Sequence, residues 1–349
     1  MATMKAAFFD GEGKMEVREI PKPEAGPGDM ILRVRSVGIC GSDLQMNVDK
    51  TEPDQLPAGH EVAGEIVEIG HGVDPSVLGK RVAVEIIGHG RACTLCWYCR
   101  QGQFRACRNM APSEGGGFAE YMKRKAIGCY PVPDSMSWEV AALVEPLAVS
   151  VHGIRLGNLK GGEVVTVLGS GNIGLTAIAA AKALGAGKVI ASARYEQQAT
   201  MAMLVGADEV YSDTGPDLWD AIAEATDGRG SDMTIETVGG HQSATMHQSV
   251  EVTRIQGRIV IIGGFRRPFE FDFLTPMLKE QQFVFSSCYN VLDGRHDYEV
   301  AIDMMASGKA DIESMVTHRY GLDDIQTAFE TAYDKNSGSV KVQIHQQPA

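Results

Sequence analysis

The sequence predicts two domains of different fold classes, an irregular β-barrel and a doubly wound parallel α/β sheet. Up to about residue 150, short strand-like runs alternate with Gly and Pro, whereas strand-like and helix-like segments alternate regularly after Gly153. A chain of 349 residues is also too long for one ordinary domain and suits two. We therefore expect the barrel to comprise residues 1–153 and 290–349, and the parallel sheet to comprise 154–289.

The expected barrel strands are short and are separated by turn residues. They fall at 31–37, 62–69 and 81–87, a spacing typical of a small barrel with long loops. From about residue 290 the sheet of the other domain is already complete. We therefore expect the last segments to return to the barrel. These segments are helices at 298–306 and 322–333 and a strand at 340–344.

In the second domain, strands alternate with helices, which predicts parallel strands joined by right-handed crossovers. The strands are expected at 164–168, 189–192, 209–211, 233–236, 259–262 and 283–285. The helices are expected at 173–184, 197–205, 218–225 and 242–254.

Composition and charge exclude several classes of protein. Apolar residues make up 44% and charged residues 22%, the balance of a soluble globular protein. The net charge of −13 argues against nucleic acid as a partner, because a phosphate backbone attracts basic surfaces. No apolar run approaches a membrane span, and the N-terminus lacks the apolar core of a signal peptide. We expect a cytoplasmic protein that binds no nucleic acid and no membrane.

A glycine-rich turn between a strand and a helix predicts a dinucleotide site of the Rossmann type. Gly169 permits the tight turn, Gly171 lets the backbone approach a pyrophosphate, and Gly174 lets helix and strand pack closely. Asn172 and Ile173 then open the helix, whose N-terminus offers unpaired N–H groups to the phosphates. The motif alone is weak, but the preceding strand and following helix support it.

The end of the next strand decides which dinucleotide binds. NAD is usually held there by an acidic residue on the ribose 2′-hydroxyl, but this chain has Arg194 instead. A guanidinium can grip a 2′-phosphate in a bidentate manner, so we expect NADP(H) to be preferred over NAD(H). Ser192 could add a hydroxyl donor, and Tyr195 could flank the adenine. Arg194 could instead be an ordinary solvated arginine.

Later strand ends add further candidate cofactor contacts, since ligands of open α/β sheets bind at the carboxyl ends of strands. Each could also be an ordinary turn residue. They are Val238, Gly263, Gly264 and Phe265.

Four cysteines in one loop predict a structural zinc site. Cys93, Cys96, Cys99 and Cys107 have the spacing C-x2-C-x2-C-x7-C, within a lobe of about 89–110. Four thiolates so close in sequence can close a tetrahedron around Zn²⁺ and leave no open position.

A second set of metal-binding residue types is spread over the first domain. Cys40 lies in CGSD, His60 in GHE, and Glu145 in EPLAV. A catalytic zinc takes three protein ligands of these types. Each residue also has an ordinary structural explanation, and spacing alone cannot join them.

The order of CGSD, GHE, the four-cysteine loop, EPLAV and GSGNIG resembles the zinc-containing medium-chain dehydrogenase superfamily over essentially the whole chain. The likeness is closest to the sorbitol (polyol) and threonine dehydrogenase branches. The resemblance implies a GroES-like barrel, an active site in the cleft between the domains, and a homodimer or homotetramer. It also implies two Zn²⁺ ions per chain, one catalytic and one structural.

The resemblance also assigns roles to individual residues. Cys40 and His60 become ligands of the catalytic zinc, and either Glu61 or Glu145 supplies the carboxylate. Asp43 then orients His60 from behind, as carboxylates commonly do for zinc-bound histidines.

One residue departs from the family pattern. Many relatives have a histidine two residues after the aspartate of CGSD, where this chain has Gln45. Ser42 is placed to pass the substrate proton outward. Gln45 does not titrate near neutral pH, so the end of this proton relay stays open.

The expected function is a zinc-dependent, NADP(H)-preferring alcohol dehydrogenase or carbonyl reductase acting on a small molecule. The leading substrates are a polyol, a sugar or ketose, or another secondary alcohol. One alternative is an NAD(P)-dependent primary alcohol dehydrogenase or aldehyde reductase. A non-catalytic zinc- and NADP-binding protein is a further alternative, as is a zinc-free quinone or enoyl reductase.

Overall fold

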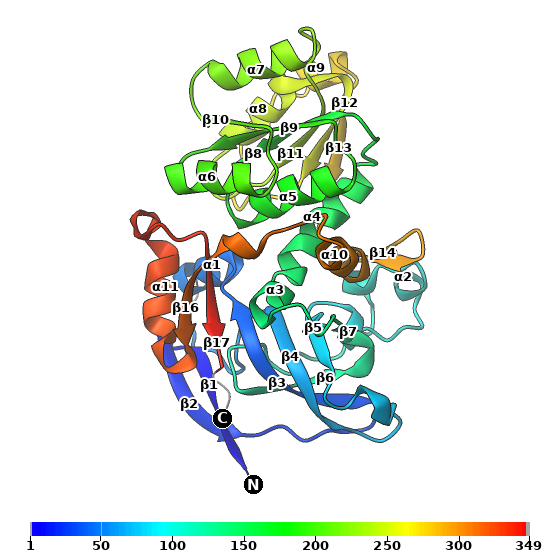
Figure 1. The fold of residues 1–349 in the computed structure, drawn as a ribbon, viewed down its shortest axis with the longest axis vertical. Coiled ribbons are helices and arrows are strands. Elements are labelled where there is room, and N and C mark those ends of the chain that lie inside the picture. The colour runs from blue at the N-terminus through cyan, green and yellow to red at the C-terminus, as the bar shows by residue number, and fades with distance from the viewer. Residues whose placement is uncertain (1, 50, 347–349) are drawn as a thin grey trace. The chain divides into compact units, whose positions relative to one another are not determined.

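The computed structural model describes residues 2–49 and 51–346 and divides the chain into two compact units (Figure 1). The first unit comprises Met1–Glu145, Asp293–Ile302 and Met315–Ala349, and the second comprises Pro146–Leu292 and Asp303–Ser314. None of the helices in the described part of the chain is long and apolar enough to cross a membrane.

The first change of unit falls inside a helix, α4 (Val144–Leu156), and not at 153/154 as the sequence analysis placed it. Glycines on α4 and directly after it explain this position. A Cβ on Gly153 would lie 2.8 Å from the Ile262 side chain, and one on Gly157 would lie 2.5 Å from Val260. This close packing binds most of α4 to the sheet of the second unit.

The first unit is built on a mostly antiparallel sheet with strand order β16-β17-β3-β4-β5-β7, and β6 pairs with β3. Its strands are β3 (Asp29–Gly38), β4 (Glu61–Ile69), β5 (Arg81–Val84), β6 (Tyr121–Lys125), β7 (Cys129–Pro131), β16 (Val316–Gly321) and β17 (Lys341–His345). The hairpin of β1 (Thr3–Phe9) and β2 (Met15–Pro21) forms a separate antiparallel pair. Because β17 pairs with β3, the closing strand returns to the barrel. The expected return of all of 290–349 is not met, since Asp303–Ser314 belongs to the second unit.

Helices of the first unit are few. They are α1 (Gly41–Asp49), α2 (Trp97–Arg100), α3 (Trp138–Ala142) and α11 (Ile325–Tyr333). The amphipathic α11 buries Ile325, Ala328, Phe329 and Ala332 at the spacing of one helix face. Phe329 packs edge-on against Phe118, at 5.7 Å between ring centroids, in the core of this unit.

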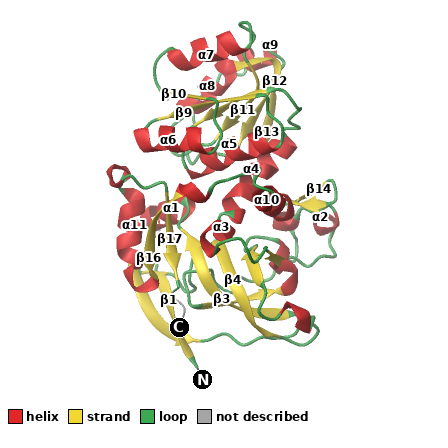
Figure 2. Ribbon diagram, viewed as in Figure 1, coloured by secondary structure: helices red, strands yellow, loops and turns green. Residues whose placement is uncertain are grey.

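The second unit is a six-stranded parallel sheet with strand order β10-β9-β8-β11-β12-β13, and Figure 2 shows helices on both of its faces. Its strands are β8 (Val164–Leu168), β9 (Lys188–Ala193), β10 (Glu209–Ser212), β11 (Ser231–Glu236), β12 (Thr253–Ile261) and β13 (Gln282–Phe285). Its helices are α5 (Asn172–Ala183), α6 (Glu196–Leu204), α7 (Asp217–Ala225), α8 (Ala244–Val252) and α9 (Leu274–Leu278). The strand order reverses between β8 and β11, where open α/β sheets bind ligands.

Three elements lie between β13 and β16 near residue 300. They are the two-residue strands β14 (Val291–Leu292) and β15 (Arg295–His296) and the helix α10 (Asp297–Ala306).

The six expected strands of the parallel sheet are all present, but one expected helix is too long. Helix α8 ends at Val252 and β12 begins at Thr253, so the expected helix 242–254 overruns into the strand. Thr253 already has extended backbone angles, with ψ at 133°. Its hydroxyl donates to Ser249 O, which caps the helix end that the sequence analysis missed.

Candidate metal centres and cofactor site

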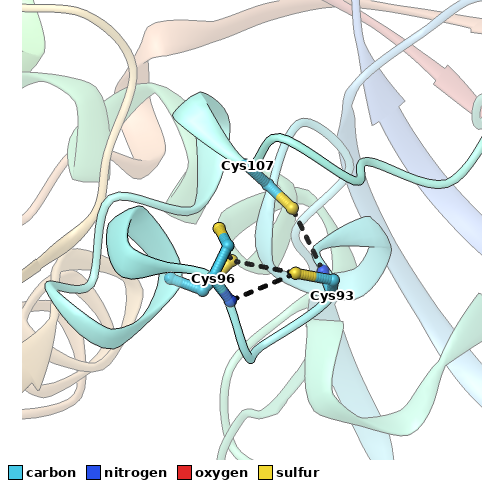
Figure 3. A group of neighbouring side chains, drawn as sticks. Cys93, Cys96 and Cys107 are labelled. Carbon is cyan, nitrogen blue, oxygen red and sulfur yellow. Dashed lines mark hydrogen bonds between the residues drawn. The ribbon is translucent and has the colours of Figure 1, made fainter.

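The four cysteines of the lobe lie together, and their sulfur atoms are all within 4.8 Å of one another. Figure 3 shows Cys93, Cys96 and Cys107 converging from two sides of the loop. The short helix α2 positions Cys99, whose Sγ lies 3.5 Å from that of Cys96. Thr94 adopts the left-handed conformation, with φ at 58°, which turns the chain tightly between the first two cysteines.

Backbone N–H groups point at some of these sulfurs and favour the thiolate form of Cys93 and Cys96 by lowering their pKa. The N–H of Cys93 donates to Cys107 Sγ at 3.2 Å, and that of Cys96 donates to Cys93 Sγ at 3.4 Å. The N–H groups of Cys99 and Arg108 lower the pKa of Cys96 to about 6. Burial instead raises the pKa of Cys99 to about 12. The convergence of four sulfurs is what fits a tetrahedral Zn²⁺ ion.

A second group with metal-ligand chemistry lies at the end of the barrel. The ligand atoms of Cys40, His60 and Glu61 lie within 4.8 Å of one another. Cys40 stands directly before α1, and His60 stands directly before β4. The sequence separates these residues by 20 positions, and the antiparallel pairing of Gly38 with Glu61 brings them together.

Asp43 supports this group from the first turn of α1. Its Oδ2 accepts the Cys40 N–H at 2.9 Å, and its Oδ1 lies 3.4 Å from His60 Nδ1. Burial lowers the pKa of His60, but the Asp43 carboxylate and the Cys40 sulfur together raise it well above the ordinary value. The negative field that raises this pKa also favours a divalent cation, so the donor set fits zinc.

The two glutamates of the expected zinc shell lie in different surroundings. Glu61 belongs to the group of ligand atoms, and Glu145 does not. Glu145 is buried in the first turn of α4, and burial raises its pKa to about 7. The Glu61 and Asp43 carboxylates contribute to this raised pKa, while His60 and Lys341 lower it.

Lys341, which the sequence analysis missed, engages both carboxylate oxygens of Glu61. Its Nζ donates to Oε1 and Oε2 at 2.7 Å each and to Ile39 O at 3.2 Å, and both side chains are buried. A Cβ on Gly38 would lie 1.9 Å from Glu61 Oε2, so glycine is required beside this ion pair. Polar and apolar residues alternate along β17 (KVQIH), so periodicity alone would place Lys341 on a solvated face, and no sequence signal marked it as buried.

Ser42 lies next to the same histidine. Its Oγ is 3.5 Å from His60 Nε2 and is partly buried. All the residues of this group belong to the first unit.

The glycine-rich turn of the second unit has the geometry that its spacing predicts. Gly169 has φ at 89°, and a Cβ on it would lie 2.3 Å from Val238 Cγ2. A Cβ on Gly174 would lie 1.8 Å from Gly169 O, so the helix packs directly against the turn. Around Gly171, the N-cap of α5, a Cβ would meet nothing within 4 Å. The open face at Gly171 can admit a pyrophosphate.

Ser192 lies beneath this turn. It is buried, and its Oγ accepts the Gly169 N–H at 3.0 Å. Ser170 Oγ donates to Ser192 O at 2.8 Å. These two bonds fix the glycine-rich turn to the end of β9.

The residues after Ser192 are more exposed. The Arg194 side chain is 67% exposed, and its Nε lies 2.8 Å from Asp213 Oδ2. Tyr195 is 37% exposed and stands at the N-cap of α6.

Glu236, a buried carboxylate that the sequence analysis missed, shapes the loop after β11. Its Oε1 accepts the N–H groups of Val238 and Gly239 at 2.9 Å each and the Thr245 hydroxyl at 2.7 Å. Burial raises the pKa of Glu236. An acidic residue at the carboxyl end of an expected strand of the parallel sheet was the available sequence signal.

Three further hydrogen bonds and a β-bridge tie this loop to its neighbours. Thr237 Oγ1 donates to Leu168 O and Gly169 O at 2.9 Å each, which joins it to the glycine-rich turn. Gly240 N donates to Gly264 O at 2.9 Å, and Gly240 forms a β-bridge with Phe265. The candidate contacts therefore lie together at the carboxyl ends of the strands, beside the glycine-rich turn. They are Val238, Gly263, Gly264 and Phe265.

Comparisons with known proteins agree with this arrangement. A family model described as the alcohol dehydrogenase GroES-like domain matches residues 26–134, and one described as zinc-binding dehydrogenase matches residues 172–307. Sorbitol dehydrogenase of Bacillus subtilis (strain 168) is 31% identical over 353 residues, covering 98% of this chain and 97% of its own. L-threonine 3-dehydrogenase of Pyrococcus abyssi is 32% identical over 353 residues, covering 97% of each chain.

A solved structure from Sinorhizobium meliloti 1021, described as a zinc-binding dehydrogenase bound to NADP, has the same fold. It superposes with a TM-score of 0.85 at 28% identity and covers 99% of this chain and 100% of its own. The barrel is thus GroES-like, the parallel sheet is a Rossmann domain, and the protein is an oxidoreductase. The chain belongs to the zinc-containing medium-chain dehydrogenase/reductase superfamily, near its sorbitol and threonine dehydrogenase branches.

Proposed function

We propose that the protein is a zinc-dependent, NADP(H)-preferring alcohol dehydrogenase or carbonyl reductase that acts on a polyol, a sugar or ketose, or another secondary alcohol. The observation that carries this proposal is the convergence of Cys40, His60 and Glu61, with Asp43 behind the histidine. The curated relatives named above act on a polyol and on a hydroxy amino acid, which are both secondary alcohols.

In this proposal Cys40, His60 and one glutamate hold a catalytic zinc, which supplies a Lewis acid to the substrate oxygen. Asp43 holds the His60 ring in the ligating orientation and fixes the backbone of Cys40. The Ser42 hydroxyl, at 3.5 Å from His60 Nε2, takes the proton from the alcohol and passes it outward. Gln45 cannot serve as the next base, so the relay ends in water or in another group.

The four cysteines of the lobe hold a second, structural zinc in this proposal, giving two ions per chain. Their closed set of thiolates leaves no position for a substrate. We place the protein in the cytoplasm, where such thiols stay reduced.

Arg194, in the unit that carries the glycine-rich turn, supports NADP(H) as the cofactor. NADP(H) supplies or accepts the hydride, and Arg194 binds its 2′-phosphate at the end of β9. The NADP-bound relative from Sinorhizobium meliloti shares this fold.

The experiment that tests the function is a steady-state screen. Polyols, ketoses, simple secondary alcohols, primary alcohols and aldehydes are offered with NADP(H) and NAD(H) side by side. The proposal requires turnover of a secondary alcohol or its ketone. Turnover confined to primary alcohols or aldehydes selects the alternative enzyme, and bound NADPH without any turnover selects a non-catalytic protein.

Arg194→Ala is expected to weaken NADPH binding by about 10- to 100-fold while changing NADH binding little. The guanidinium makes charge-assisted hydrogen bonds that only the 2′-phosphate can accept, each worth about 1.5–3 kcal/mol. Fluorescence titration of each reduced cofactor measures the effect. Arg229→Ala is the matched control, because Arg229 is also an exposed arginine of this unit paired with an aspartate. Equal losses for both cofactors in Arg194→Ala would contradict the assignment.

An exposed apolar edge on the second unit supports a homodimer as the minimal assembly. The edge strand β13 carries Phe285, which is 71% exposed, and α9 beside it in sequence carries Leu278 at 69% and Met277 at 64%. A sheet edge leaves N–H and C=O groups unpaired, and a two-fold axis lets the same strand of a second copy satisfy them. Light scattering on purified protein tests this, and a monomer at micromolar concentration would refute it.

A further inference from the structure

The end of the outermost strand of the parallel sheet brings an acid to the expected ribose site. Strands β9 and β10 are parallel neighbours, and Ser212 pairs with Ala193. The next residues, Asp213 and Arg194, therefore leave the sheet side by side. Their side chains meet, with 2.8 Å between Arg194 Nε and Asp213 Oδ2.

This pair stands where the adenosine ribose of a dinucleotide lies. In doubly wound sheets that ribose sits over the end of the strand that follows the glycine-rich helix, which is β9 here. The turn and the strand end are linked directly, because Ser192 Oγ accepts the Gly169 N–H. Arg194 follows Ser192 by two residues, and Asp213 lies beside Arg194 on the neighbouring strand, so both are within reach of the same ligand.

NAD-binding chains of this fold carry an acid at the end of this strand, and this chain has Arg194 there instead. In the structure a carboxylate still lies at this place, because Asp213 follows the neighbouring strand β10 and contacts Arg194. We propose that Asp213 is a cofactor-specificity residue. Its carboxylate accepts a hydrogen bond from the 2′-hydroxyl of NAD(H) and repels the 2′-phosphate of NADP(H), whereas Arg194 attracts that phosphate. This inference rests on the proposed function, in which Arg194 faces the 2′ position.

The geometry lets both residues act in one site. Asp213 engages the Nε of Arg194, and among the described residues none accepts a hydrogen bond from its two terminal amino groups. A guanidinium has five donors, so Arg194 can hold a phosphate while keeping Asp213. Asp213 is 22% exposed and Arg194 is 67% exposed, so the acid is the more fixed partner.

An ordinary surface ion pair makes a different prediction. Exposed pairs contribute little to stability, and their loss affects both cofactors alike. A carboxylate at the 2′ position affects the two cofactors in opposite directions, because one presents a hydroxyl donor and the other presents an anion.

Asp213→Asn tests the inference, since it removes the charge and keeps the shape. NADPH is expected to bind about three- to tenfold more tightly and NADH about three- to tenfold more weakly. Dissociation constants come from fluorescence titration of each reduced cofactor with the full chain, and thermal melting checks the fold. Asp227→Asn is the matched control, because Asp227 pairs with Arg229 on the same unit. It should change neither constant.

The outcomes separate this inference from the proposed function. If Arg194→Ala lowers the preference for NADPH but Asp213→Asn leaves it unchanged or weakens both cofactors alike, the role of Asp213 is refuted and the proposed function stands. If neither variant changes the preference, the 2′-phosphate assignment and this inference both fail.

Discussion

Cys40→Ala is expected to lower kcat/KM for the best substrate of the screen by on the order of a thousandfold. Cys40 lies with His60 and Glu61 in the group proposed to hold the catalytic zinc. A bound cation contributes several kcal/mol to stabilising charge on a substrate oxygen, and each 1.36 kcal/mol changes the rate tenfold. Steady-state kinetics and metal analysis measure the two consequences together. The zinc content should fall by one ion per chain.

Two controls distinguish lost chemistry from lost structure. Cys129→Ala removes a thiol of the same barrel that lies outside both groups of ligand atoms, and it should keep turnover and both metal ions. NADPH should still bind to Cys40→Ala, because the glycine-rich turn belongs to the other unit. A Cys40→Ala protein that retained both zinc ions and full turnover would overturn the proposed catalytic centre.

Cys96→Ser is expected to remove the other zinc ion and to lower the melting temperature by on the order of 10 °C. The lobe has few buried apolar side chains of its own. In such sites the free energy of metal binding contributes directly to the free energy of folding. Loss of a structural metal is one of the few single changes that cost more than about 4 kcal/mol, which corresponds to this shift in a unit of this size. Calorimetry and zinc analysis measure both effects.

Limited proteolysis shows which part of the variant has lost its structure. Cleavage should appear within 89–110 in Cys96→Ser and not in the Cys129→Ala control, because the rest of the barrel keeps its strands. Zinc analysis that finds no metal in the wild-type lobe, or an unchanged melting temperature in the variant, would argue that these thiols have no structural role.

Local patterns made much of this molecule predictable from its sequence. The six strands of the parallel sheet and the glycine-rich turn follow from short-range periodicity and from positions where only glycine fits. The four-cysteine lobe follows from spacing over 15 residues, and the structure brings all four sulfurs together. Each of these features, a single strand, the glycine-rich turn or the cysteine lobe, is formed by residues close together in the sequence.

Contacts between distant segments could not be predicted in the same way. The Glu61–Lys341 pair joins residues 280 positions apart, and Asp213 meets Arg194 only because β10 lies beside β9. The sequence analysis named Glu61 and Arg194 but not their partners. It left the choice between Glu61 and Glu145 open, and the structure places Glu61 with Cys40 and His60. Strand pairing decides such contacts, and single-sequence periodicity does not specify it.

The buried Lys341 has a consequence for how the protein is made. Its ammonium group ties the carbonyl of Ile39 to the carboxylate of Glu61, so it braces the two segments that end in Cys40 and His60. On a ribosome, those segments emerge about 280 residues before their brace, and until then Glu61 is an uncompensated charge that resists burial. We therefore expect the metal-binding end of the barrel to become ordered only once the strand that carries Lys341 is in place.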